Sequence, residues 1–462
     1  MKVRWLLLGG AAAVACVTVC AADLDELFRP LPAQGQSLWD AGVQVDHPWG
    51  KEVFTQYEVA SYRSNTAYTP SAGVQTGLTD ALRLSVSGDF MDNSWKLDSW
   101  NKDWSANLGL IWQASPGLRL QFGYRYERAT SSDIEWEAWD PYFYARDQWA
   151  ASRQTTALSV QWLTRPKPAY ERLVPDLNGL IGPLLDPGQS LLEASVSVLH
   201  RGEDRQGIET DSPASKMVVR THTGYTGPWT AQAQWTMGLP HAWEIKLSGI
   251  TTTPYDQRGM GVWLYPPPVF SGPYRAHWPQ TFDASVEADR RWGQSFQLGF
   301  GGEANWWQHE SFLEDTRSAF VSAVFVSRPT RKGEPLGRNL DGLLLPMLDP
   351  GQVRWDGRLT ARWYGWTGSQ QWWEMDNTVT VGVARAVQFQ ALVNLTPDLE
   401  PGYGPRGDRW THYVAGLGVV YRPCSRVEIR GAYRYAYDRS AGGHIEDTDL
   451  MHTFRLTASL LW

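Results

Sequence analysis

The 462-residue sequence predicts an all-β fold, namely one antiparallel β-barrel that spans a membrane and has about 18 strands, within a range of about 16 to 20. Three observations predict this fold. Apolar and polar residues alternate with period two in segments of about nine to eleven residues, the length with which a tilted strand crosses a bilayer. One motif recurs three times, and about six such segments follow each copy. The chain also holds 26 Trp and 19 Tyr, and these aromatic residues favour the membrane interface.

The composition argues against several other classes of protein. Outside the N-terminus there is no apolar run of about 18 residues, so the sequence does not predict a bundle of transmembrane helices. Charged residues make up 20% of the chain and hydrophobic residues 42%, which argues against wholesale disorder. The formal net charge of -7 argues against a nucleic-acid partner.

The N-terminus has the features of a secretory signal peptide. Residues 1–22 begin with basic residues, continue through an apolar stretch from Trp5 to Val19 and end on small residues, which predicts cleavage after Ala22. The mature chain would then cover 23–462 and keep Cys424 as its single cysteine, so no internal disulfide is expected.

Strand faces can be read directly from the alternation. In residues 82–90, 118–127 and 427–438, apolar and aromatic residues occupy one face and charged or small polar residues the other. One such strand could also belong to a soluble β-sandwich. The end of the chain is more specific, because its apolar residues alternate up to the last position: Phe454, Leu456, Ala458, Leu460 and Trp462.

This ending resembles the C-terminal strand signal of bacterial outer-membrane β-barrels, which ends in Phe or Trp and is read by the barrel assembly machinery. No more specific family is indicated. The resemblance implies a location in the bacterial cell outer membrane, contact with outer-membrane lipid, and engagement of the assembly machinery by the C-terminal strand. With an even number of strands, both ends of the mature chain would lie on the periplasmic side.

The recurring motif divides the barrel into three sequence repeats. Its copies at 24–36, 177–189 and 340–352 align without gaps and share identical Leu, Leu, Pro, Gly and Gln positions. The expected repeats cover about 23–175, 176–338 and 339–462. In the third repeat, strands are predicted at 353–366, 376–384, 387–395, 411–421, 426–437 and 452–462.

The connections between these strands are of two kinds. Short turns recur, for example at 78–81 and 422–425, whereas longer polar and aromatic connections are expected at 129–153, 254–280 and 396–410. Outer-membrane barrels have short periplasmic turns and longer extracellular loops, so the repeated motif should lie on the periplasmic side. We favour a rim cap whose leucines cover the lower edge of the barrel. The alternative is that the three motifs fold under the lumen as a constriction or dock a periplasmic partner.

Strand parity places both signs of charge inside the barrel. The expected lumenal bases are Arg83, Arg119, Arg125, Lys246, Arg354, Arg358, Arg362, Arg430 and Arg434. The expected lumenal acids are Asp89, Glu127, Glu244 and Glu428, together with Asp40, Glu193 and Asp356 at the periplasmic mouth. Such a mixed wall predicts a hydrated interior without strong ion selectivity. The three mouth acids share one position in the repeats, where they could form a cation-attracting ring or pair with neighbouring arginines, and we favour pairing.

Aromatic residues gather in two of the expected long loops. They include Trp136, Trp139 and Tyr142 in one loop and Trp263, Tyr265 and Trp278 in the other. We favour the interfacial girdle of any outer-membrane barrel. The sharper alternative is that these rings stack on the apolar faces of sugars.

The sequence offers no catalytic or metal-binding constellation, and no cofactor is expected. The nine histidines are scattered, and His309 and His444 are expected to be solvated loop residues. We therefore expect no enzyme but a porin-like transport channel for polar solutes, with saccharides as the favoured class. Two alternatives remain open: an export barrel for an exopolysaccharide or other glycan, and a non-conducting scaffold that docks a periplasmic partner through its repeated turns.

Overall fold

The computed structural model describes residues 31–54, 59–64, 66–94, 100–115, 117–136, 144–164, 181, 184–185, 187–212, 215–253, 255–264, 270–278, 280–293, 295–308, 313–327, 347–364, 370–396, 409–442 and 445–462. The predicted signal peptide lies outside these residues. Among the residues described, no helix is long and apolar enough to cross a membrane.

The described chain forms strand segments in one antiparallel sheet, interrupted by a single turn of 3-10 helix at Pro240–Ala242. The first seven segments are β1 (Ser37–Phe54), β2 (Val59–Ser64), β3 (Ala67–Gly77), β4 (Leu82–Ser94), β5 (Trp100–Ser115), β6 (Leu118–Trp136) and β7 (Tyr144–Leu163). The next eight are β8 (Ser190–Ser212), β9 (Ser215–Leu239), β10 (Trp243–Thr252), β11 (Tyr255–Leu264), β12 (Phe270–Trp278), β13 (Thr281–Trp292), β14 (Phe296–Gln308) and β15 (Leu313–Val326). The last six are β16 (Val353–Tyr364), β17 (Gln370–Ala384), β18 (Val387–Thr396), β19 (Arg409–Cys424), β20 (Val427–Gly442) and β21 (Ile445–Leu461).

These 21 segments make a closed barrel of 18 strands, because three strands are each interrupted once. β2 and β3 pair with successive parts of β1, β10 and β11 pair with successive parts of β9, and β12 and β13 pair with β11 and β10. β21 pairs with β1 along its whole length and closes the sheet. The predicted all-β barrel and its strand number are therefore confirmed. Each strand predicted in 339–462 overlaps one of the strands β16 to β21.

Large apolar side chains are exposed around the outside of the barrel. In β21, Phe454, Leu456 and Leu460 are exposed, and in β15 Val321 and Phe325 are exposed at alternate positions. Successive side chains of a strand point to opposite faces, so these residues define the outward face and their immediate neighbours point into the lumen. An apolar belt of this extent is unfavourable in water and needs lipid around it.

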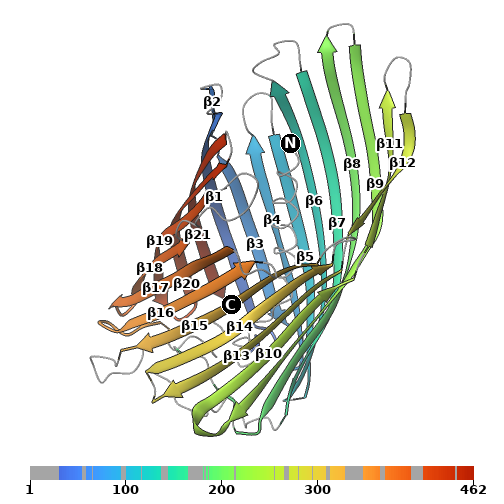
Figure 1. Cartoon of the computed structure of the whole chain (residues 1–462). Helices are drawn as coiled ribbons and strands as arrows, with labels where there is room; N and C mark the ends of the chain where they lie inside the picture. Colours follow the sequence, from blue (N-terminus) through green and yellow to red (C-terminus); the bar gives the residue numbers. More distant parts are fainter. Residues whose placement is uncertain are drawn as a thin grey trace.

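The two rims of the barrel differ. Both described ends of the chain and the tight turns lie at one rim, for example 78–81 between β3 and β4 and 425–426 between β19 and β20; we call this rim the short-turn mouth. At the opposite rim β6 to β9 are long, and they rise with β11 and β12 above the rest of the barrel (Figure 1).

This asymmetry corrects two expected loops. Residues 129–136 and 144–153 belong to β6 and β7, and most of 254–280 belongs to β11 and β12, so the loop prediction is wrong there. Cross-strand hydrogen bonding extends these strands beyond the expected barrel height, although their sequence is polar and aromatic like that of a loop. The third expected loop agrees better, since β18 ends at Thr396 and β19 begins at Arg409.

Candidate functional site: the lumenal wall and the short-turn mouth

The thirteen lumen candidates lie on strands at positions that point inward. Each is flanked along its strand by residues of the outward face, as Lys246 is by the exposed Leu247. They differ in burial. Arg83, Arg119, Glu244 and Glu428 are buried near the short-turn mouth, whereas Arg434 has an exposed side chain further up the wall.

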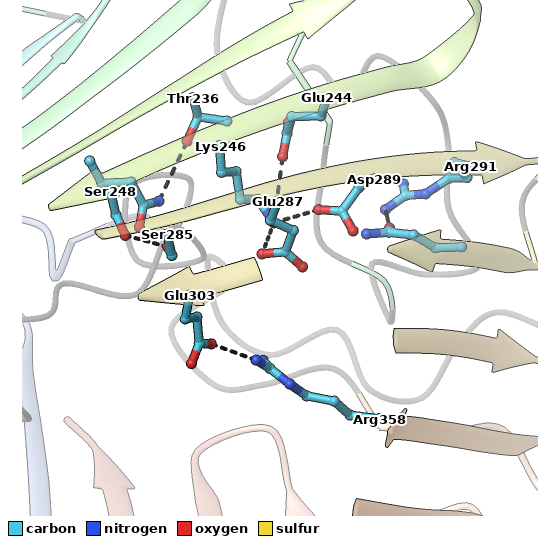
Figure 2. Close-up of polar contacts among 12 residues, drawn as sticks. Thr236, Glu244, Lys246, Ser248, Ser285, Glu287, Asp289, Arg291, Glu303 and Arg358 are labelled. Atoms are coloured by element: carbon cyan, nitrogen blue, oxygen red, sulfur yellow. Dashed lines mark hydrogen bonds and ion pairs between the residues drawn. The ribbon is translucent and has the colours of Figure 1, made fainter. Parts of the chain in front are cut away.

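A charged cluster covers the inner faces of β10 and β13 (Figure 2). The ammonium of Lys246 lies 2.7 Å from Asp289 Oδ2, 3.7 Å from Glu287 Oε2 and 3.8 Å from Glu244 Oε1. Asp289 is only 2% exposed. One lysine thus partly balances three carboxylates, which lets acids from neighbouring strands pack together.

A second network continues the charged wall across β14 to β17. Arg358 Nη2 lies 2.7 Å from Glu303 Oε1, and Arg362 Nε donates to Glu374 Oε2 at 3.0 Å. The Arg358 guanidinium also stacks 3.8 Å above the ring of Phe320, an inward residue of β15. These contacts tie four strands together on the lumenal side.

Other lumenal charges are paired within one strand or across one turn. Arg125 and Glu127 approach to 2.5 Å, and Glu428 accepts hydrogen bonds from both Arg422 and Arg430. Arg83 donates to backbone carbonyls of its own turn, and Arg119 donates to the Gln113 side chain at 2.9 Å. Asp89 accepts from the Ser105 hydroxyl. The inner wall is therefore strongly polar, and much of its charge is neutralised locally.

The three copies of the repeated motif make the same turn at the short-turn mouth. Gly35, Gly188 and Gly351 have φ of 78°, 79° and 82°, a left-handed conformation that glycine adopts without steric cost. Each donates its N–H to a glycine carbonyl at the end of the second strand that follows: Gly35 to Gly77 (3.0 Å), Gly188 to Gly238 (2.8 Å) and Gly351 to Gly382 (2.7 Å).

The partner glycines allow the turns to lie on the inner side of the wall. A Cβ at Gly77 would stand 2.0 Å from the Ala33 carbonyl oxygen, and a Cβ at Gly382 would stand 2.1 Å from that of Asp349. Both glycines occupy inward positions of their strands. The backbone of the repeated motif therefore crosses the wall inside the lumen, not below its edge.

The second residue of β4, β10 and β18 differs in hydrogen-bonding character according to the repeated turn to which it corresponds. The second residue of β10, Glu244, accepts the Leu185 N–H at 3.1 Å, and the second residue of β18, Gln388, accepts the Leu348 N–H at 3.2 Å. The corresponding residue of the first motif is Pro32, which has no N–H to donate. There the second residue of β4 is Arg83, a donor, whose guanidinium bonds the carbonyls of Asp80 and Leu82 beside the β3–β4 turn.

Apolar side chains of the motif are buried in two clusters. Leu185 packs with Leu163 and Leu191, the inward residues at the ends of β7 and β8. Ile181, from the same copy, packs with Val326 of β15 and with Leu348 of the third copy. The leucines thus bury against the barrel, as the cap interpretation expects, but they do so on its lumenal side.

The three mouth acids occupy inward positions near the repeated turns, each with a polar contact. Ser459 Oγ donates to Asp40 Oδ1 at 2.5 Å, Gln161 Nε2 donates to Glu193 Oε1 at 2.7 Å, and Arg354 pairs with Asp356 at 2.7 Å. Arginine pairing is thus seen at Asp356, and neutral donors contact the other two.

The structure changes the interpretation of the aromatic residues. Trp136 and Trp278 end β6 and β12, and Trp263 lies within β11, so their assignment to loops is wrong. Trp139, Tyr142 and Tyr265 lie outside the described residues, as do His309 and His444.

Several lumenal charges were missed from sequence. The wall also contains Asp283, Glu287, Asp289, Glu303 and Glu374. Period-two alternation in 281–292 would have placed the first three inside, but their partners depend on register between strands. In the described part of the chain, no group of three or more His, Cys, Asp or Glu residues could hold a metal ion.

Comparisons with known proteins identify the fold. No family model matches the sequence, and no curated protein matches it either. The ferric yersiniabactin uptake receptor FyuA from Yersinia pestis aligns over 93% of this chain and 80% of its own, with a TM-score of 0.50 and 6% identity. The ferric citrate transporter FecA aligns over 94% and 79%, with a TM-score of 0.48 and 8% identity. The TodX monoaromatic hydrocarbon channel aligns over 93% and 91%, with a TM-score of 0.42 and 8% identity.

The chain therefore has the fold of a bacterial outer-membrane β-barrel, as its C-terminal strand predicts. The lipid-facing belt and the closed sheet agree with the expected location in the outer membrane. No particular family within this class is defined.

Proposed function

We propose that this barrel is an outer-membrane transport channel for polar solutes, with saccharides as the favoured class. The observation that carries the proposal is the polar inner wall of an 18-stranded barrel. Strands about 4.8 Å apart and tilted by about 40° would enclose a barrel about 35 Å across between backbones, too wide for wall side chains alone to fill. A wall lined by ionised and hydrogen-bonding groups is stable only if it is hydrated or paired.

The chemistry of the wall favours neutral solutes over ions. The charged networks of β10 to β17 hold their bases and acids within ion-pair distance, which reduces the field in the lumen. On the other side of the barrel the inward residues also include hydroxyls and amides between the charged groups. They can donate and accept hydrogen bonds as sugar hydroxyls do: Gln44, Thr69, Ser71, Gln75, Gln390, Asn394, Thr453 and Thr457.

The comparison with the highest TM-score of the three supports the same class of function. FyuA is named as an uptake receptor, and it aligns over 93% of this chain. None of the three solved structures is named as an enzyme, and we assign this chain no catalytic residue.

Liposome swelling tests the proposal. The purified barrel is reconstituted in liposomes, which are diluted into isotonic solutions of a neutral pentose, a neutral disaccharide, an anionic uronic acid and a cationic amino sugar. We expect swelling with the neutral sugars at rates that fall with size, and little difference between the two charged sugars. Swelling no faster than in protein-free liposomes would contradict the proposal and favour the non-conducting scaffold.

A further inference from the structure

We propose that the three repeated turns form a collar inside the short-turn mouth, and that this collar is the narrowest part of the channel. The collar consists of residues 31–36, Ile181, 184–185, 187–189 and 347–352. This inference rests on the proposed transport function, because a constriction matters only if solutes pass.

The first step is that all three turns are fixed to the wall in the same way. In each, the turn glycine donates to the strand glycine, and the strand glycine donates back to the glutamine that ends the motif: Gly77 to Gln36 (3.0 Å), Gly238 to Gln189 (3.0 Å) and Gly382 to Gln352 (2.9 Å). Gln189 and Gln352 are 2% and 0% exposed. The turns are thus part of the folded wall at three places around the mouth.

The second step is that two described residues of the second copy contact strands that are not neighbours in the sheet. Its Leu185 is held at β10 by Glu244, whereas its Ile181 packs against Val326 on β15. β13 and β14 lie between those two strands in the sheet. The contacts of Ile181 and Leu185 on the lumenal side are therefore made with two strands that β13 and β14 separate.

The third step is that two copies meet. Ile181 and Leu348 belong to one buried cluster, and each is 3% exposed. Burial of apolar surface is the main favourable term in folding, so this contact holds the second and third turns together. Buried contacts thus hold the described residues of both turns on the lumenal side of the mouth, where they take up part of its width.

Charge placed in the buried contacts tests the collar. In Leu185→Asp and Leu348→Asp a carboxylate replaces a buried leucine, and its desolvation cost should release the turn from the wall. The matched control is Ser425→Asp, which adds the same charge at an exposed position of the β19–β20 turn, at the same mouth but outside the collar. In planar bilayers we expect the two leucine variants to conduct at least about twofold more than wild type, with admission of larger sugars, and the control to behave like wild type.

Cross-linking tests the same contact without loosening it. Ile181→Cys and Leu348→Cys are combined in a Cys424→Ser background, and the folded protein is treated with a short bifunctional thiosulfonate. We expect an intramolecular cross-link, detected as a joined peptide by mass spectrometry, and a conductance no higher than that of wild type. Labelling of both thiols without any cross-link would overturn the collar.

The conductances of wild type, the leucine variants and the control together distinguish failure of the collar proposal from failure of the transport proposal. If wild type conducts and the leucine variants match the control, the collar is overturned and the transport function stands. If no variant conducts although all of them fold, the transport function fails. If wild type is silent but the leucine variants conduct, the transport function proposed for the wild-type barrel is contradicted, whereas the collar is supported as the element that blocks its lumen.

Discussion

Arg358 on β16 and Glu303 on β14 form an ion pair of 2.7 Å although β15 lies between their strands. The arginine reaches across β15 by lying flat on Phe320, and the Phe320 ring in turn lies over Gly301 of β14. At this place the lumenal wall is therefore layered, with a glycine beneath an aromatic ring and the ring beneath a charged side chain.

This layering predicts that Gly301→Ala destabilises the barrel by about 1–3 kcal/mol. The new Cβ would stand 2.3 Å from the Val286 carbonyl oxygen and 2.6 Å from Phe320 Cζ, so the ring must move. Urea unfolding in lipid vesicles measures the change. Gly123→Ala is the matched control, because its Cβ would meet nothing closer than 4.0 Å; an equal loss of stability in both variants would contradict the layered packing.

The burial of Glu428 predicts a larger effect from loss of its charge. Glu428 is 1% exposed and bonds both Arg422 and Arg430, so Glu428→Gln takes the carboxylate away from a buried guanidinium. We expect a loss of about 3 kcal/mol or more in the free energy of unfolding. Glu127→Gln is the comparison, because the side chains of Glu127 and its partner Arg125 are each 25% exposed. It should lower the free energy of unfolding by about 1 kcal/mol or less. Thermal unfolding followed by circular dichroism compares the two, and equal shifts would argue against a buried role for Glu428.

The mouth acids predict a change in ion selectivity. Replacing Asp40, Glu193 and Asp356 with their amides removes three negative charges from the lumenal side of the short-turn mouth. We expect the reversal potential in a salt gradient to shift towards anions at low salt. The shift should fade as salt rises, since the Debye length falls from about 10 Å at 0.1 M to about 3 Å at 1 M.

Asp80→Asn is the control for that experiment, because Asp80 lies in the exposed turn between β3 and β4, outside the lumenal wall. An unchanged reversal potential in the triple variant at low salt, together with a lower unfolding temperature, would mean that the acids serve only in structural pairs.

The exposed thiol of Cys424 tests the orientation in the membrane. It ends β19 at the short-turn mouth, which we expect on the periplasmic side. A bulky polyethylene-glycol maleimide should label it in permeabilised cells and leave it unlabelled in intact cells. A Gly442→Cys variant in a Cys424→Ser background places a thiol near the opposite rim and should label in intact cells. Labelling of Cys424, but not of the Gly442→Cys variant, in intact cells would show that the barrel has the opposite orientation in the membrane.

The sequence predicts the strands and their faces well, because period-two alternation is a local signal. It places Lys246 and Glu244 inside, and β16 to β21 close to their observed positions. It could not pair Lys246 with Asp289, because that contact depends on the register between β10 and β13. It also misjudged the tops of β6 and β7, where cross-strand hydrogen bonds order segments that read as loops.

The repeated motif shows the same limit. Its glycine and glutamine positions stand out in the sequence, but nothing local indicates that the turn lies inside the wall. A sign of this placement lies in residues that are far from the motif in the sequence. Glu244 and Gln388 accept the N–H groups of the second and third turns, whereas Arg83, a donor, occupies the corresponding strand position for the first turn, which has Pro32.

Single-channel recording of the purified, folded wild-type barrel and of Leu185→Asp in planar bilayers tests the central claim most directly, namely that solutes pass through a hydrated lumen. We predict ohmic current through both proteins, at least about twofold larger through Leu185→Asp than through wild type, and weak selectivity between cations and anions in each. Silence of both proteins at every voltage, with heat-modifiable migration showing that both are folded, would contradict the account.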